Sequence, residues 1–217
     1  MPYFKNCNIL FIHIPQTGGT SLEKYFVNNC NNGIFAEDSE ILYSGNGVTN
    51  YKNIVHFDHT LQHLTYLEIK KINKYLNIDF NNVKIITIVR NPYDRLISDL
   101  FFYKLIDENY TENQVENAIK NYLVSNENYD NHKTLQYKFL INEHGNILSN
   151  IIILKTETLN EDIKKIGYYD FNIHSQTTFK NKLNYHTMIN RNAQNIIFNY
   201  YQKDFQYFGY SFFLNRI

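Results

Sequence analysis

Two short runs of apolar residues, each followed by a turn and then a helical pattern, set the strongest limits on the fold. Residues 8–14 and 84–90 are rich in β-branched side chains and contain no acidic residue. Such runs are typical of strands that are buried on both faces of a parallel sheet. A parallel sheet is covered by helices on both sides, and its ligands bind at the carboxyl ends of its strands. We therefore expect a binding site at residues 15–21 and 90–98.

The rest of the chain continues the alternation of strands and helices. Apolar runs predict further strands at residues 53–57 and 149–155. Helical spacing and capping residues predict helices at residues 20–32, 65–75, 92–101, 111–123, 158–166 and 190–209. Asn91 with Pro92, Thr111 with Gln114, and Thr158 with Glu161 mark three of the helix starts. No repeat or Pro/Ser-rich linker interrupts the pattern, so we predict a single α/β domain over residues 1–217, with a central parallel sheet flanked by helices.

Charge and composition exclude several classes of partner. Twenty-one Lys and Arg residues balance twenty-one Asp and Glu residues, so the chain lacks the long-range field that captures nucleic acids or anionic membranes. It shows no signal-peptide pattern and no apolar stretch of about 20 residues that could span a membrane. We expect a cytoplasmic protein with neither a nucleic-acid nor a membrane partner. Cys7 and Cys30 are the only cysteines, and we expect two buried, reduced thiols.

The first turn, residues 15–21, has the composition of a phosphate-binding loop. A glycine-bearing turn between a strand and a helix points several backbone N–H groups into one concavity, at the positive end of the helix dipole. Gly18 and Gly19 permit close approach of a ligand, and the hydroxyls of Thr17, Thr20 and Ser21 add uncharged donors. The segment resembles a P-loop but lacks its Lys. The alternative is a glycine turn that serves only tight packing of the strand on the helix.

The second turn, residues 90–98, offers a charged grip on an anion. Arg90 ends a predicted strand just before a helix begins, where its guanidinium can bind a phosphate with two parallel hydrogen bonds. Ser98 lies two helical turns further on and can add a hydroxyl to the same anion. The alternatives are an ion pair between Arg90 and Asp94, and an Arg95 that is a solvated or salt-bridged helix residue.

Both turns resemble the donor-binding motifs of one enzyme family. Residues 14–22 are similar to the 5′-phosphosulfate loop, and residues 89–98 to the 3′-phosphate motif, of the sulfotransferases that use 3′-phosphoadenosine 5′-phosphosulfate (PAPS), in their carbohydrate branch. Residues 153–162 and 201–212 resemble two later segments of that family. The resemblance covers almost the whole chain, with residues 109–150 contributing least.

The resemblance implies a fold related to P-loop nucleotide kinases and transfer of a sulfuryl group from PAPS to an acceptor hydroxyl, on a carbohydrate or a small molecule. By position, Arg90 and Ser98 would hold the 3′-phosphate of PAPS and of its product PAP. The residues that would hold the 5′ end are Gln16, Thr17, Gly18, Gly19, Thr20 and Ser21. No metal is implied. We expect these two sets of residues, residues 16–21 and Arg90 with Ser98, to bind opposite ends of one nucleotide, and we call them the two grips.

Gln16 departs from the family, which usually has a Lys that stabilises the departing oxygen. A neutral amide forms weaker hydrogen bonds than a cation does. We expect another cation to substitute, and the candidates are Lys24, Lys155, Lys180, Lys182 and Arg191. A PAP- or PAPS-binding module that has lost catalysis is the alternative. A small-molecule kinase is less well supported, because we find neither a P-loop Lys nor carboxylates for magnesium.

Sulfuryl transfer to a hydroxyl requires a group that accepts the hydroxyl proton. Residues 55–65 contain three of the chain's eight histidines. His63 is the first candidate base, because His63-Leu64-Thr65 is similar to a His-x-Thr segment in bacterial members of the family. His56 is the second candidate and His59 the third. His59 and His63 also have the spacing of a helical metal pair, but we find no third ligand and predict no metal.

Overall fold

A four-stranded sheet carries the first predicted turn. In the computed structural model its strands are β1 (Tyr3–Phe4), β2 (Ile9–Ile12), β5 (Lys84–Val89) and β6 (Ile151–Lys155), in the order β1-β2-β5-β6. β5 pairs in parallel with β2 and with β6, and β1 is antiparallel to β2. The structure describes residues 2–30, 49–51, 55–172 and 185–213. Three parallel strands combined with helices confirm the predicted α/β class.

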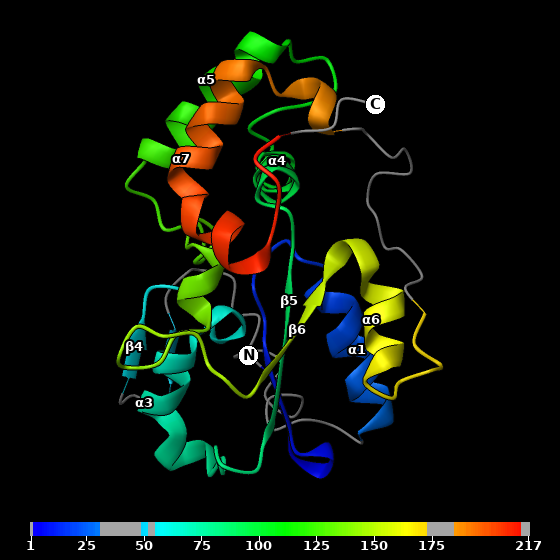
Figure 1. Cartoon of the computed structure of the whole chain (residues 1–217). Helices are drawn as coiled ribbons and strands as arrows, with labels where there is room; N and C mark the ends of the chain where they lie inside the picture. The colour runs from blue at the N-terminus through cyan, green and yellow to red at the C-terminus, as the bar shows by residue number, and fades with distance from the viewer. Residues whose placement is uncertain (1, 31–48, 52–54, 173–184, 214–217) are drawn as a thin grey trace. The chain divides into compact units, whose positions relative to one another are not determined.

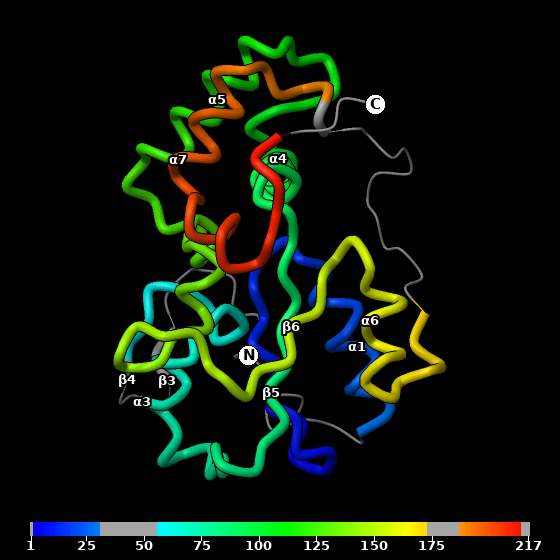
Figure 2. Tube along the Cα trace, in the orientation of Figure 1, coloured from blue at the N-terminus to red at the C-terminus, as the bar shows by residue number. Residues whose placement is uncertain are grey.

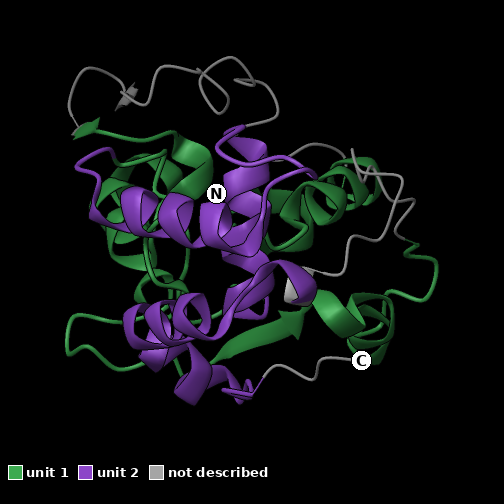
Figure 3. Ribbon diagram, turned by 90° about the horizontal axis from the view of Figure 1, so that it is seen from above, with its two compact units in different colours: residues 1–89, 128–175 green, residues 90–127, 176–217 purple. Residues whose placement is uncertain are grey.

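The chain divides into two compact units, and each unit combines two separate segments of the sequence (Figure 3). Unit 1 contains residues 1–89 and 128–175, and unit 2 contains residues 90–127 and 176–217. The four-stranded sheet belongs to unit 1, whereas Arg90 is the first residue of unit 2. A single domain over residues 1–217 stays a prediction.

The helices of unit 1 lie on both sides of its sheet. Helices α1 (Gly19–Asn29) and α6 (Leu159–Lys165) lie on one side, and α3 (Tyr66–Leu76) lies on the other (Figures 1 and 2). Short 3-10 helices connect these elements; they are η1 (Lys5–Cys7), η2 (Leu61–His63), η3 (Gln136–Phe139) and η4 (Thr156–Thr158). The capping box predicted at Thr158 and Glu161 is wrong, because the Thr158 hydroxyl donates to Asp162 at 2.6 Å instead.

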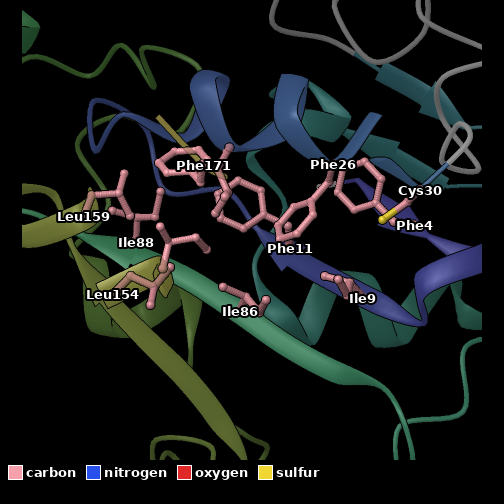
Figure 4. Packing of buried hydrophobic residues seen from close by; sticks show 12 residues of the cluster. Phe4, Ile9, Phe11, Phe26, Cys30, Ile86, Ile88, Leu154, Leu159 and Phe171 are labelled. Carbon is pink, nitrogen blue, oxygen red and sulfur yellow. The ribbon is translucent and has the colours of Figure 1, made fainter. Parts of the chain in front are cut away.

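The core between the sheet and helices α1 and α6 consists of large aliphatic and aromatic side chains (Figure 4). Phe11 on β2 and Phe26 on α1 are fully buried within it. Burying each such side chain contributes about 1.5–3 kcal/mol. The core therefore fixes β2 against α1, and with them the turn that joins the two. Its other members are Phe4, Ile9, Leu22, Cys30, Ile86, Ile88, Leu154, Leu159, Ile163 and Phe171.

Cys7 and Cys30 form a disulfide, so the prediction of two reduced thiols is wrong. The packing of α1 on the first strand explains the pairing. The rings of Phe4 and Phe26 lie 5.3 Å apart between centroids, and the cysteines follow them by three and four residues. The contact brings η1 against the end of α1, leaving the Cα atoms of the two cysteines 5.5 Å apart. A count of cysteines could not show this proximity.

The strand predicted at residues 53–57 lies outside the parallel sheet. Its described part is β4 (Val55–Phe57), which pairs with β3 (Thr49–Tyr51) in a separate antiparallel pair of strands. The expectation that strands alternate with helices throughout one parallel sheet is therefore wrong for this segment. A run of three to five apolar residues does not reveal which partner it will pair with.

Unit 2 contains three α-helices within its described residues, α4 (Pro92–Phe102), α5 (Glu112–Val124) and α7 (Arg191–Phe208), with the 3-10 helix η5 (Tyr185–Met188). α7 packs against both α4 and α5. The predicted capping box of Thr111 and Gln114 is confirmed, and Gly209 ends α7 with a left-handed φ of 66°. In the part of the chain described, no helix combines the length and the apolar character that crossing a membrane requires.

Candidate functional site

The turn between β2 and α1 has the backbone geometry of an anion-binding loop. Gln16 and Gly18 have φ angles of 61° and 86°, in the left-handed region. Gly18 is the N-cap of α1 and supplies no side-chain hydrogen bond there. The first N–H groups of a helix lack intrahelical acceptors, and they lie at the positive end of the helix dipole. The loop can therefore present backbone donors to a phosphate or sulfate group.

Thr156 ties this loop to the ends of the neighbouring strands. Its hydroxyl lies 2.7 Å from the carbonyl oxygen of Thr17 and 3.2 Å from that of Val89, the last residue of β5. The Thr17 hydroxyl donates to the carbonyl of Ile14 at 2.8 Å and is fully buried. Thr17 therefore does not supply the hydroxyl donor that we expected, although its backbone N–H belongs to the same loop. Thr20 is exposed and Ser21 is partly exposed.

A buried histidine lies directly beneath the loop. A Cβ atom built at Gly19 would lie only 2.4 Å from the ring of His13. Nδ1 of His13 lies 2.7 Å from Oε1 of Glu23, whose second oxygen accepts a hydrogen bond from Gln62 at 2.9 Å. Burial alone would raise the pKa of Glu23, but the interactions with His13 and Gln62 outweigh it and lower the pKa. Glu23 is therefore a carboxylate that orients His13. No sequence pattern predicted this group of side chains.

His63 is paired with Asp130. Nδ1 of His63 lies 2.9 Å from Oδ2 and 3.0 Å from the backbone oxygen of Asp130. Burial lowers the pKa of His63 to about 3, although the hydrogen bond to Asp130 opposes this effect. Burial would raise the pKa of Asp130, but hydrogen bonds from His63 and Thr60 hold it below its usual value. A neutral His63 therefore donates its Nδ1 proton to a carboxylate, which leaves Nε2 as an acceptor.

The other two candidate bases have different surroundings. His56 is exposed on β4. His59 is buried, with Nδ1 2.9 Å from Asp58 and Nε2 3.4 Å from Glu68. Burial would lower the pKa of His59, but the two carboxylates outweigh it and raise the pKa. These contacts give His59 a structural role next to the start of α3.

Two contacts, both made by the ring of His13, connect the donor loop with His63. The His13 ring faces Gly19, and the His13 and His63 rings meet edge to face with 5.3 Å between their centroids. The ring of His132 also contacts His63, with 5.1 Å between their centroids. The ring of His13 therefore lies between the loop and His63, and no sequence pattern shows this proximity. Asp130 follows it by 67 residues, which is why its role was not predicted.

The second predicted grip belongs to unit 2. Arg90 directly follows β5 and is partly buried, as is Ser98 on α4. The Asn91 side chain caps α4 by accepting a hydrogen bond from the N–H of Tyr93 at 3.0 Å, as expected. Arg95 is almost completely buried, so it is not a solvated helix residue. The binding of one nucleotide by both grips stays a prediction.

The candidates for a replacement cation are distributed over both units. Lys155 is the last residue of β6 and pairs in register with Val89. It directly precedes Thr156, whose hydroxyl binds the loop. Lys24 is exposed on α1, and Arg191 begins α7 in unit 2. Lys180 and Lys182 lie outside the described residues. Among the candidates, Lys155 therefore adjoins a residue that is hydrogen-bonded to the donor loop.

The two later motif segments have clear structural roles. Asp162 accepts hydrogen bonds from the backbone of Lys155 at 3.2 Å and from Thr158, and so connects β6 with α6. In the segment 201–212, the side chains of Tyr201, Asp204 and Phe205 are buried in unit 2. These residues therefore stabilise the fold.

A comparison with protein families gives a match over nearly the whole chain. The model described as "Sulfotransferase family" matches residues 3–211. This range includes both predicted motifs and both compact units. The comparison with curated proteins gave no match, and neither did the comparison with solved structures.

Proposed function

The chain belongs to the sulfotransferase family, and from this we propose that it transfers the sulfuryl group of PAPS to a hydroxyl group of a carbohydrate. Membership of the family makes the protein a transferase with a hydroxyl-bearing acceptor. The donor and the class of acceptor are our proposal. The observation that carries it is the position of His63, a neutral histidine held by Asp130 and separated from the predicted donor loop only by the ring of His13.

We assign the donor to the two predicted grips. Backbone N–H groups at the start of α1 would bind the 5′-phosphosulfate, as helix N-termini commonly bind anions. The left-handed conformations of Gln16 and Gly18 support this assignment. Arg90 and Ser98 would bind the 3′-phosphate, which distinguishes PAPS from ATP. Preference for a 3′-phosphorylated nucleotide therefore tests this assignment directly.

We assign the general base to His63. The acceptor oxygen would attack the sulfur atom while the bond from sulfur to the bridging oxygen of PAPS breaks, and PAP leaves. The acceptor proton would pass to Nε2 of His63, because Nδ1 already carries the proton that is donated to Asp130. Fixing the tautomer in this way is the usual role of a carboxylate beside a catalytic histidine. A positioned base contributes roughly 100- to 10,000-fold to a rate, most when its pKa lies near the operating pH. The low pKa of the buried His63 places its expected contribution at the lower end of this range.

Gln16 leaves the departing oxygen without the usual cation. We propose that Lys155 supplies the charge, because β6 ends at this residue and the next residue, Thr156, binds the loop. A module that binds PAPS without transferring its sulfuryl group remains the second candidate, and Gln16 is the observation that favours it. No step in either case needs a metal.

The disulfide between Cys7 and Cys30 bears on the compartment in which the protein works. We predicted a cytoplasmic protein, but disulfides persist mainly in oxidising compartments. The bond between Cys7 and Cys30 therefore supports a protein that works outside the reducing cytosol. The test is the redox state of the two cysteines in the cell that makes the protein.

Two measurements test the function. Titration calorimetry with PAP and with ATP should show a clear preference for PAP, and equal binding would exclude the proposed donor. Transfer of labelled sulfate from PAPS to a panel of glycans should then identify the acceptor class. Strong PAP binding without transfer to any hydroxyl acceptor would support the binding module instead.

A further inference from the structure

His63, Asp130 and His132 form a cluster of metal-ligating side chains inside unit 1. One ligand atom of each residue lies within 4.8 Å of those of the other two. The closest pair is Nδ1 of His63 and Oδ2 of Asp130, 2.9 Å apart. We propose that this cluster binds a transition-metal ion, with Zn²⁺ as the best-fitting one.

The surroundings hold these side chains in place. The backbone N–H and the hydroxyl of Thr60 donate to Asp130 at 2.6 and 3.1 Å. The Asn131 side chain donates to the carbonyl oxygen of His63 at 2.9 Å. His63 and His132 are only 6% and 4% exposed. Hydrogen bonds that orient the ligands are typical of metal sites and strengthen binding.

The backbone that carries two of the ligands has an uncommon conformation. Tyr129, Asp130 and Asn131 have φ angles of 50°, 51° and 68°. A left-handed conformation costs a residue with a side chain roughly 1–2 kcal/mol, and three such residues in succession require compensation. The result of this turn is that Asp130 and His132 both contact His63.

The chemistry of the donors selects the metal. Two imidazoles and one carboxylate are ligands that Zn²⁺ binds at about 2.0–2.2 Å, in tetrahedral sites that keep a fourth position for water. Ligands at those distances lie roughly 3.4 Å from one another in a tetrahedron. On binding the ion, the cluster must contract toward His132, from separations of up to 4.8 Å, and open slightly between His63 and Asp130, which lie 2.9 Å apart. Mg²⁺ and Ca²⁺ prefer all-oxygen ligands and fit poorly.

Metal binding would change the state of His63, a consequence that rests on the proposed function. When Nδ1 coordinates the ion, its proton must leave that atom, and the neutral ring then carries its proton on Nε2. That nitrogen can no longer accept the proton of an acceptor hydroxyl. Zn²⁺ should therefore inhibit sulfuryl transfer while leaving the donor loop intact.

Binding is tested on the full chain after treatment with EDTA, without any activity measurement. Co²⁺ should produce the visible absorption of a four-coordinate ion at one equivalent, and Zn²⁺ should displace it. His132→Gln removes a ligand and should weaken binding by more than the roughly 10- to 100-fold that loss of a residue hydrogen-bonded to a ligand costs. His144→Ala, at an exposed histidine of the same unit, should bind like the wild type. Equal binding by His132→Gln, or no saturable Co²⁺ signal, would overturn the site.

A second measurement does not depend on a variant that folds. With ¹⁵N-labelled histidine, Zn²⁺ should move the proton of one buried ring from Nδ1 to Nε2 in the wild-type protein, and an unchanged tautomer would overturn the proposal. In the transfer assay, Zn²⁺ should inhibit the wild type and lose its effect on His132→Gln. Saturated binding without inhibition would overturn the role of His63 as base and leave the metal site standing, so the two failures are distinguishable.

Discussion

The ring of His13 occupies the space beside Gly19 that a side chain would need, since a Cβ atom there would lie 2.4 Å from the ring. Gly19 does not have a positive φ, so its importance comes from this contact and not from backbone strain. The donor loop therefore contacts the buried ring of His13 at Gly19.

Gly19→Ala should therefore damage both the loop and the fold. Overpacking of this kind costs about 1–3 kcal/mol, and displacement of the loop should weaken PAP binding. In a protein that already carries His13→Ala the same change should be nearly neutral, because alanine is otherwise a good residue in a first helical turn. Urea unfolding and PAP titration of the four proteins measure the coupling, and additive effects would contradict the contact.

Asp130→Asn should lower kcat about 100-fold or more, the range expected for losing a positioned base. Asparagine keeps the size of the side chain but removes the charge that fixes the His63 tautomer. The affinity for PAP should not change, which separates proton transfer from donor binding. His63→Ala should behave in the same way, while His56→Ala, on the exposed strand β4, should retain transfer. Loss of activity only in His56→Ala would assign the base to that residue.

The pair of His59 and Glu68 should make stability depend on pH. The pKa of His59 is raised from 6.5, so its contribution is complete below that value and is lost as pH rises through the folded pKa. The pKa of Glu68 is lowered from 4.5, so its contribution is lost as pH falls through its folded value. Glu68→Gln should thus cost about 1 kcal/mol near pH 5.5 and less near pH 8.5.

Glutamine at position 68 is a suitable control for the helix start. A capping box accepts Glu or Gln at its third helical position, so the hydrogen bonds with Thr65 are retained and only the charge is removed. Urea unfolding at several pH values gives the difference between the wild type and the variant. A difference that is constant across pH would show that the ion pair contributes nothing.

Reduction of the Cys7–Cys30 bond should destabilise the protein by roughly 3 kcal/mol, as expected for closing a loop of this length. Cys7 is exposed, so a reductant can reach the bond. Unfolding with and without reductant measures the effect, and a protein with both cysteines replaced by serine should not respond to reductant. An equal response in that variant would mean that the reductant acts elsewhere.

Lys155→Ala should lower turnover if this residue replaces the usual loop lysine. Gln16→Lys should then restore much of the loss, because it returns a cation to the position where the family carries one. Steady-state transfer rates at saturating PAPS measure both variants and their combination. A large gain from Gln16→Lys in the wild-type background would show that the protein has no substitute cation.

Local sequence patterns predicted the main elements of the fold. The runs at β2 and β5 form strands that are buried on both faces, and the run at β6 forms the next strand although only Leu154 within it is buried. The Asn91 cap with Pro92 marked the start of α4. Each of these signals is contained in a segment of about ten residues. The glycine turn after β2 was equally local, and the structure gives Gly18 within it a left-handed conformation.

The interactions that complete the candidate site are not local. Gln62 and Glu23 are 39 residues apart and His63 and Asp130 are 67 apart, so only the folded chain brings them together. The disulfide depends likewise on the packing of Phe4 on Phe26. Spacing along the chain favoured His59 and His63 as neighbours, whereas the fold gives each of them different carboxylate partners.

The interleaving of the two units also sets an order of assembly during synthesis. Residues 1–89 supply β2, α1, β5 and all three candidate histidines, but Asp130 and His132 emerge only after the whole segment 90–127 has been made. A nascent chain can therefore begin to pair its central strands while His63 still lacks its carboxylate. The pair of His63 and Asp130 can form only after the chain has returned from unit 2 to unit 1.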